Sequence, residues 1–307
     1  MIGNTFYLNW EIELIAKLQG AFSSIAPTFS KVFSAFGSEI VLVGIILYIY
    51  LAYDKKIGRK IMINTVIGLE LGCAIKNVFQ RRRPYMDTDK VKCLIPVDNS
   101  ADVNDLIAQG FSFPSLHSFN IACITGSLYK YIKTRTLLVF AIAMSFFVGI
   151  SRIVTANHFP TDVIAGWLLG IISIELVNFL QDKIEKRKLY IFLSIVMSFG
   201  FLFCKSNDFF SGYGIMIGFF IGDLIEEKYI KFENTKSIVK TIARIILAAA
   251  LFLAFCEGSK LLVNETFQET LTLPAFIFRT FRYALGTFVA CGISPMIYKY
   301  NILKINK

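Results

Sequence analysis

Two histidines, the only two in the chain, stand beside side chains that suit phosphate chemistry. His117 closes the run Pro-Ser-Leu-His, which contains Ser115, and His158 follows the pair Ser151-Arg152 after five intervening residues. One imidazole with an unprotonated ring nitrogen can attack phosphorus, and another can protonate the leaving oxygen and then activate water. The pair therefore suits transfer of a phosphoryl group, with one histidine as nucleophile and the other as acid and base.

The position of Asp162, four residues after His158, indicates which histidine is the nucleophile and which is the acid and base. A carboxylate at this spacing can hold one ring N–H of His158 and stabilise the charged ring, as the orienting group of a catalytic triad does. His158 is therefore the expected nucleophile, and His117 the expected acid and base. Asp162 could also cap the helix that follows Pro160, since Asp is favoured at helix N-termini.

The expected cations around the phosphate are Lys76, Arg83 and Arg152. A transferring phosphoryl group spreads negative charge over three oxygens, so its transfer depends on positioning and on fixed positive charges. Arginine donates to phosphate oxygens through a planar fork, whereas lysine acts as a point charge. Ser115 and the amides of a helix start add further donors. Such a set can act without a metal.

The elements that must position these residues are membrane-spanning helices. The chain has 307 residues, of which 55% are hydrophobic and 18% charged, and its mean hydropathy is +0.59. Apolar runs recur near the length of about 20 residues that crosses a bilayer. We expect an all-α, polytopic transmembrane helical bundle of about nine spans. The expected spans lie near 38–53, 60–76, 117–132, 135–152, 162–180, 188–205, 210–226, 238–257 and 273–298.

Basic residues flank alternate connections between these spans, near 55–60, 130–135, 183–188 and 299–304. The positive-inside rule places these connections and the C-terminus in the cytoplasm, and the N-terminus and both histidines on the outer face. The net charge of +10 lies in these clusters rather than on one soluble face, so no nucleic acid partner is expected.

Three arginines break the topology rule, because Arg81, Arg82 and Arg83 lie in the outward segment. Together they are expected to bind an anion, which favours a diphosphate, but Arg81 and Arg82 could instead serve as interfacial anchors. Arg279 and Arg282, in an apolar run near the C-terminus, either pair inside the bundle or line an entrance for lipid head groups.

The chain divides into three expected regions. Residues 8–33 mix apolar side chains with Glu11, Glu13 and Lys17, which is typical of a helix lying in the membrane interface. All clusters of candidate catalytic and phosphate-binding residues lie before residue 186. We therefore expect an interfacial amphipathic segment at 1–37, a catalytic helical core at 38–185 and a C-terminal transmembrane helical extension at 186–307.

The three polar segments resemble the signature of the type 2 phosphatidic acid phosphatase superfamily. Its first motif is Lys, six residues, Arg-Pro, which fits Lys76 to Pro84. Its third is Ser-Arg, five residues, His, three residues, Asp, which fits residues 151–162 at every defining position. Its second is Pro-Ser-Gly-His, in which Leu116 replaces Gly here. The resemblance covers roughly residues 38–180, and Leu116 is expected to narrow the pocket or to shift substrate preference.

This resemblance implies a helical core that needs no metal or other cofactor, a phosphohistidine at His158, and Ser151 beside the other phosphate ligands. The topology is similar to the glucose-6-phosphatase and sphingosine-1-phosphate phosphatase branches, and the run His-Phe-Pro-Thr-Asp to bacterial members. The expected activity is hydrolysis of a lipid phosphate monoester or polyprenyl diphosphate, among membrane lipids, on the outer face of a bacterial cell membrane. The alternatives are a membrane transporter or lipid translocase, and a phosphotransferase that uses an acceptor other than water.

Overall fold

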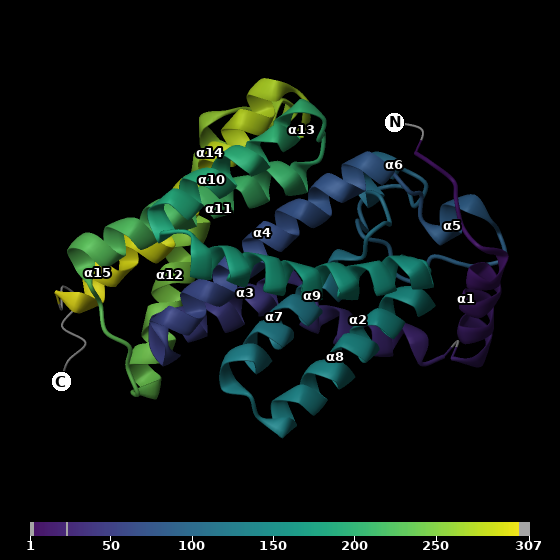
Figure 1. Ribbon diagram of the computed structural model, residues 1–307. Helices are drawn as coiled ribbons and strands as arrows, with labels where there is room; N and C mark the ends of the chain where they lie inside the picture. Colours follow the sequence, from purple (N-terminus) through teal and green to yellow (C-terminus); the bar gives the residue numbers. More distant parts are fainter. Residues whose placement is uncertain (1–2, 23, 301–307) are drawn as a thin grey trace. The chain divides into compact units, whose positions relative to one another are not determined.

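The protein is all-helical in the part that the structure describes, residues 3–22 and 24–300 of a computed structural model. Its α-helices are interrupted by short 3₁₀ and π segments, and the described residues form no β-strand. Figure 1 shows the helices in chain order. The expected all-α class is confirmed.

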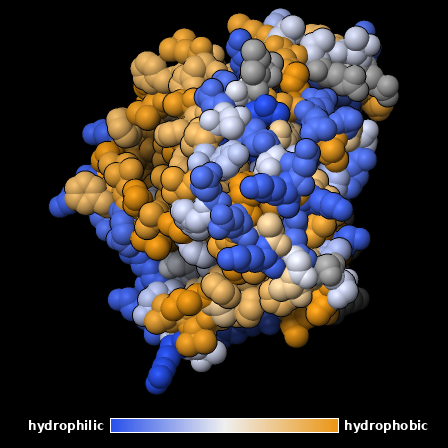
Figure 2. Space-filling model, turned by 90° about the vertical axis from the view of Figure 1, so that its right-hand side faces the viewer, coloured by the Kyte–Doolittle hydropathy of each residue, from blue (hydrophilic) through white to orange (hydrophobic). Residues whose placement is uncertain are grey.

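Among the described residues, six helices are long and apolar enough to cross a membrane. They are Lys55–Phe79, Arg135–Val154, Pro160–Lys183, Asn207–Ile230, Ile238–Leu262 and Leu273–Lys299. The other three expected spans are also helical but shorter: α3 (Glu39–Tyr48) with a π segment to Tyr53, α7 (Leu116–Ile132), and α10 (Lys186–Ser198) with a 3₁₀ segment to Leu202. The count of nine spans therefore stays a prediction. Figure 2 shows apolar side chains over wide areas of one face, beside polar ones.

The chain folds into two compact units, each made of two stretches of sequence. The first unit comprises Met1–Leu42 and Leu71–Leu176, and the second comprises Val43–Glu70 and Val177–Lys307. Helices α4 (Lys55–Phe79) and α9 (Pro160–Lys183) each contribute residues to both units. The predicted functional boundaries at 37/38 and 185/186 stay a prediction.

The first unit holds every candidate catalytic residue. Its helices are α1 (Asn9–Ala21), α2 (Ala26–Phe36), the end of α4, α5 (Pro84–Asp87), α6 (Leu106–Gln109), α7, α8 (Arg135–Val154) and most of α9. Helices α7 and α8 form a hairpin, and α8 also packs against α2 and α1. A buried apolar cluster that includes Ile15, Val91 and Phe159 joins α1 to the turn between α8 and α9.

The N-terminal segment differs from the single interfacial helix that was expected. It forms two helices: α1 ends at Ala21, and α2 begins at Ala26. Glu11 does not lie on a solvated polar face: its side chain is fully buried, whereas Glu13 is exposed. Burial of this carboxylate requires partners, and these lie in the candidate site described below.

The second unit packs α11 (Asn207–Ile225) against α14 (Leu273–Phe288), and α12 (Ile238–Gly258) against the same helix. A Cβ at Gly218 would lie 2.2 Å from the carbonyl oxygen of Ala284, so only glycine permits this approach of α11 to α14. In the last turn of α11, the buried Asp223 accepts hydrogen bonds from Lys186 at 3.0 Å and Tyr190 at 2.9 Å. The unit is completed by α13 (Glu265–Glu269) and α15 (Ser294–Lys299).

Candidate active site

The first basic motif lies at the end of α4 and in the segment that follows. Lys76 is in the last turn of α4, and Gln80, with a left-handed φ of 50°, ends the helix. The Lys76 ammonium donates to the carbonyl oxygen of Phe111, which ties α4 to the loop before α7. Arg83 directly precedes the short helix α5.

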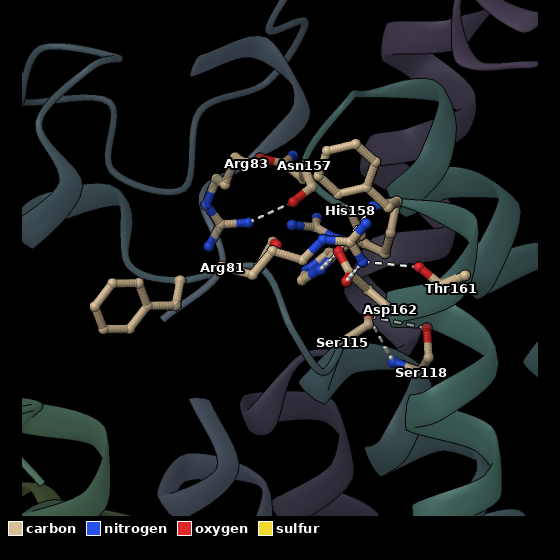
Figure 3. A network of polar contacts seen from close by, with 12 residues as sticks. Arg81, Arg83, Ser115, Ser118, Asn157, His158, Thr161 and Asp162 are labelled. Atoms are coloured by element: carbon tan, nitrogen blue, oxygen red, sulfur yellow. Dashed lines mark hydrogen bonds and ion pairs between the residues drawn. The ribbon is translucent and has the colours of Figure 1, made fainter. Parts of the chain in front are cut away.

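Arg83 is buried and held by backbone carbonyl groups. Its Nε and Nη2 donate to the carbonyl oxygen of Gln109 at 2.9 and 2.6 Å, and its Nη1 donates to that of Asn157 at 2.8 Å. The bond to Asn157 fixes the guanidinium next to the residue that precedes His158 (Figure 3).

The second motif forms the start of α7 and lies directly against α9. Ser115 is the N-cap of α7, and its Oγ accepts a 2.9 Å hydrogen bond from the Ser118 hydroxyl. The Ser115 amide donates to the backbone carbonyl oxygen of Asp162 at 3.0 Å. A Cβ at Gly166 of α9 would lie 2.5 Å from the Ser115 carbonyl oxygen, so glycine is required for this close approach. His117, in the first turn of α7, is half-buried and lies within electrostatic range of Arg152, Arg83 and Lys76.

The third motif begins in the last turn of α8. The Ser151 hydroxyl donates to the Val148 carbonyl oxygen at 2.6 Å and lies 3.1 Å from the Ser34 hydroxyl of α2. Arg152 donates from Nη1 to the same Ser34 hydroxyl at 3.2 Å. Its Nε is buried and has no hydrogen-bond partner among the described residues. That nitrogen is therefore able to donate to a substrate.

The turn between α8 and α9 brings His158 to Asp162. The His158 amide donates to the Arg152 carbonyl oxygen at 3.2 Å. Nδ1 of His158 lies 3.5 Å from Oδ2 of Asp162, which is longer than an ordinary hydrogen bond. The same carboxylate oxygen accepts a 2.8 Å bond from the Phe159 amide. Asp162 is the third residue of α9, so it caps the helix and also faces the histidine.

Burial lowers the pKa of His158 well below its usual value, and the positive charges of Arg83, Lys76 and Arg152 lower it further. His158 lies in the loop between α8 and α9, with 3% of its surface exposed. The ring is therefore neutral at physiological pH, which is the form that a nucleophilic imidazole requires.

An ion network behind Asp162 was not foreseen from the sequence. Arg81 donates from Nη1 to Oδ1 of Asp162 at 2.6 Å and from Nη2 to Oε2 of Glu11 at 3.1 Å. The other oxygen of Glu11 accepts the amide and the hydroxyl of Thr161, at 3.1 and 2.7 Å. One buried arginine thus bridges two buried carboxylates, one from α1 and one from α9. Figure 3 shows the contacts of Arg81 with Asp162 and Thr161.

Arg81 is enclosed as well as paired. Its guanidinium carbon lies 3.9 Å from the Phe159 ring centroid and 4.8 Å from that of Phe6, and only 2% of the residue is exposed. Arg82 contacts Asp87, with Nε 3.3 Å from a carboxylate oxygen. The arginine run therefore gives no support to a diphosphate, because two of its three members are held by protein carboxylates. In the sequence, the three consecutive arginines indicated a special role for this segment. No sequence feature indicated that Glu11, 70 residues from Arg81, would join it.

Leu116, which departs from the family motif, packs against α4. Its Cδ2 lies 2.5 Å from the position that a Cβ would take on Gly72, so the absent side chain of Gly72 makes room for it. The Leu116 side chain is thus accommodated at the contact with Gly72 of α4. The described residues include no group of three or more His, Cys, Asp or Glu side chains that could hold a metal ion.

Two protein-family models match the chain. The model described as PAP2 superfamily matches residues 58–186, and the model described as PAP2 superfamily phosphatase, transmembrane extension, matches residues 210–304. The first range contains all eight candidate residues of the three motifs. Together with the six apolar helices, the transmembrane extension identifies an integral membrane protein.

Three characterised relatives are similar to parts of the chain. An undecaprenyl-diphosphatase of Sulfolobus acidocaldarius is 29% identical over 154 residues, which are 50% of this chain and 67% of that protein. Phosphatidylglycerophosphatase B of Bacillus subtilis is 35% identical over 87 residues, 25% of this chain and 43% of that protein. Lipid A 4'-phosphatase of Bacteroides thetaiotaomicron is 25% identical over 174 residues, 53% of this chain and 74% of that protein. No solved structure matches the chain.

Proposed function

The chain belongs to the PAP2 superfamily, and we propose that it is a phosphatase that hydrolyses a lipid phosphate through a phosphohistidine at His158. The observation that carries this proposal is the neutral, buried imidazole of His158, facing Asp162 on one side and surrounded by Arg83, Arg152 and Lys76. A neutral nucleophile among fixed cations is suited to attack on a phosphate dianion.

In the first step, the three cations hold the phosphate oxygens and Nε2 of His158 attacks phosphorus. Its other nitrogen, Nδ1, faces Asp162, so the carboxylate stabilises the positive charge that develops on the ring. Contacts of this kind are often long before substrate binds, and we expect the 3.5 Å separation to shorten when the ring becomes charged. A P–N bond forms and the ester P–O bond breaks. His117, which takes up a proton when the negatively charged phosphate binds beside it, gives that proton to the leaving alcohol oxygen.

In the second step, His117 is neutral and accepts a proton from a water molecule. The oxygen of this water attacks phosphorus, the P–N bond breaks, and inorganic phosphate leaves with His158 restored. An alcohol in place of water would make the same intermediate a phosphotransferase, so the identity of the acceptor separates these two activities.

The proposed substrate class is a phosphate carried on a lipid, either a monoester or a polyprenyl diphosphate. The three relatives are named for activity on undecaprenyl diphosphate, phosphatidylglycerophosphate and lipid A. The candidate residues lie at the ends of apolar helices, where a lipid head group would reach them from the membrane. We further propose that the site faces the outside of a bacterial cell membrane and that the C-terminus is cytoplasmic.

The test is phosphate release from a panel of lipid phosphates by the detergent-purified full chain, in EDTA. His158→Ala should abolish release, whereas Lys90→Ala, at an exposed loop position, should leave it unchanged. With an aryl phosphate, whose leaving group needs no proton, His117→Ala should accumulate an acid-labile phosphoprotein that His158→Ala lacks. Release that survives in His158→Ala would sink the mechanism, and no release from any lipid would favour a transporter.

A further inference from the structure

A cavity of about 960 Å³ lies within the second unit, where α11 and α14 begin and α12 ends. Its walls include Arg279 and Arg282 of α14, Lys260 just beyond α12, and Asn207 at the start of α11. All of its lining residues belong to the second unit, and none is a candidate catalytic residue. Whatever this cavity binds is therefore bound by different residues from those of the proposed phosphatase site.

Two arginines on one face of α14 set the charge of the cavity. Arg282 is 3% exposed, and its Nε and Nη2 both donate to the Cys256 carbonyl oxygen, at 3.1 and 2.8 Å. Arg279, one turn earlier, is half-buried and donates from Nη2 to the Gln268 carbonyl oxygen at 3.4 Å. Among the side chains that the structure describes, neither guanidinium forms an ion pair with a carboxylate. Cations in this state favour an anion nearby, because a buried charge without a counter-charge is costly.

The remaining charges that line the cavity cancel each other. Lys260 pairs with Glu257 at 2.7 Å, and Glu257 is the only carboxylate among the described lining residues. Asp208, next to the lining residue Asn207, interacts with the charge of Arg279 from a distance, but neither Arg279 nor Arg282 has a carboxylate within ion-pair distance among the described side chains. The side-chain amide of Asn207 adds a further donor to the wall, whereas that of Gln268 donates to the carbonyl oxygens of Lys260 and Val263. This combination matches the needs of a phosphate group, which accepts several hydrogen bonds and carries negative charge.

The surroundings of the cavity favour an amphiphile over a free ion. Helix α12 forms one wall, and only 6% of its most apolar membrane-spanning window is buried in the protein. Leu261 lines the cavity with 90% of its surface exposed, and the neighbouring Leu262 is 77% exposed. Apolar surface of this kind beside a cationic cavity suits acyl chains next to a charged head group.

We propose that this cavity binds the phosphate of an anionic lipid, with Arg279 and Arg282 as its ligands. The lipid is a bound ligand of the second unit and not a substrate there, because the described lining residues include no histidine that could form the phosphohistidine of the proposed mechanism. Free phosphate shares the same chemistry, and the experiment below separates the two.

The experiment measures lipid binding to the delipidated full chain by native mass spectrometry. The probes are dioleoylphosphatidylglycerol, dioleoylphosphatidylcholine and inorganic phosphate. Phosphatidylglycerol carries a phosphodiester, so it is no substrate for the proposed monoesterase. Arg279→Gln is compared with Arg187→Gln, which makes the same change at an exposed arginine of the same unit. Arg279→Lys keeps the charge, and thermal unfolding checks that each variant is folded.

We expect phosphatidylglycerol to bind the wild type, Arg187→Gln and His158→Ala alike. Arg279→Gln should bind it about tenfold or more weakly, because one charge-assisted hydrogen-bonding group is lost, and Arg279→Lys should fall between. Equal binding of the two lipids, or an unchanged affinity in folded Arg279→Gln, would overturn the proposal. Loss of the lipid in His158→Ala would assign it to the catalytic unit. Displacement of the lipid by inorganic phosphate that itself binds would replace the lipid assignment by a free-phosphate site.

Discussion

Replacing Glu11 by Gln tests whether the buried ion network controls the geometry of His158. The carboxylate accepts four hydrogen bonds: Oε2 accepts from the Leu8 amide at 2.9 Å and from Arg81 at 3.1 Å, and Oε1 accepts from the amide and hydroxyl of Thr161. Glutamine keeps one acceptor oxygen and turns the other into an NH₂ group. In either orientation of the amide, its NH₂ group takes the place of one acceptor oxygen. The two hydrogen bonds to that oxygen are then lost, and the NH₂ group faces the donors that made them.

The expected cost follows from these contacts. Hydrogen bonds to a charged group contribute about 1.5–3 kcal/mol each, so the loss of two should lower the free energy of unfolding by about 3–6 kcal/mol. Arg81 then keeps one of its two carboxylate anchors and holds Asp162 less firmly. Because small misplacements of catalytic groups are costly, we expect kcat to fall about 10- to 100-fold. KM should change little, since neither Glu11 nor Arg81 is placed to touch the phosphate.

The assay combines steady-state phosphate release with thermal unfolding of the purified protein. Glu13→Gln is the matched control, because it makes the same change two residues away in α1 at an exposed side chain. We expect a lower Tm and a lower kcat for Glu11→Gln alone, with slower formation of the phosphohistidine. If Glu11→Gln and Glu13→Gln were indistinguishable in both Tm and kcat, the network would have no role in positioning Asp162.

Three further predictions concern His158 and two close helix contacts. Because burial and neighbouring cations lower the pKa of His158, the neutral nucleophile should persist below the ordinary histidine pKa of about 6.5. Activity should then be lost only as the pH falls through that lower value, and an acid limb of kcat/KM at or above 6.5 that belongs to His158 would contradict this. Gly72→Ala should lower the free energy of unfolding by about 1–3 kcal/mol, because the new methyl group would lie 2.5 Å from Cδ2 of Leu116. Adding Leu116→Ala should restore most of the Tm, and additive losses in the double variant would refute the contact. Gly166→Ala should push the start of α7 away from α9, since its Cβ would lie 2.5 Å from the Ser115 carbonyl oxygen. Phosphate release should fall by about tenfold or more, and unchanged release from a folded Gly166→Ala would show that this approach is dispensable.

Some features of the site could be predicted from the sequence because they depend on near neighbours along the chain. The four-residue spacing of His158 and Asp162 places both at one helix start, and the structure finds the carboxylate capping α9 while it faces the ring. Ser115 likewise precedes a helix as its N-cap. The all-helical fold followed from the lengths of the apolar runs, because a bilayer requires each spanning segment to satisfy its own backbone hydrogen bonds.

Other features depended on which helices pack together, and no local pattern carried them. Glu11 belongs to an amphipathic stretch that is typical of an interface, yet it is buried because α1 lies beside Arg81 and Thr161, residues 70 and 150 positions away. The consecutive arginines suggested a common role, but each meets a different partner once the chain folds.

The sequence by itself was sufficient to predict the chemistry of this protein, because residue types and short spacings indicate a nucleophile, its carboxylate and the cations for a phosphate. Only the tertiary structure decided which of those charges remain available to a substrate. Arg81 forms ion pairs with two carboxylates, whereas Nε of Arg152 has no hydrogen-bond partner among the described residues. The physical reason is that a charge is neutralised by groups close in space, and in a helical bundle these come from helices far apart in the sequence.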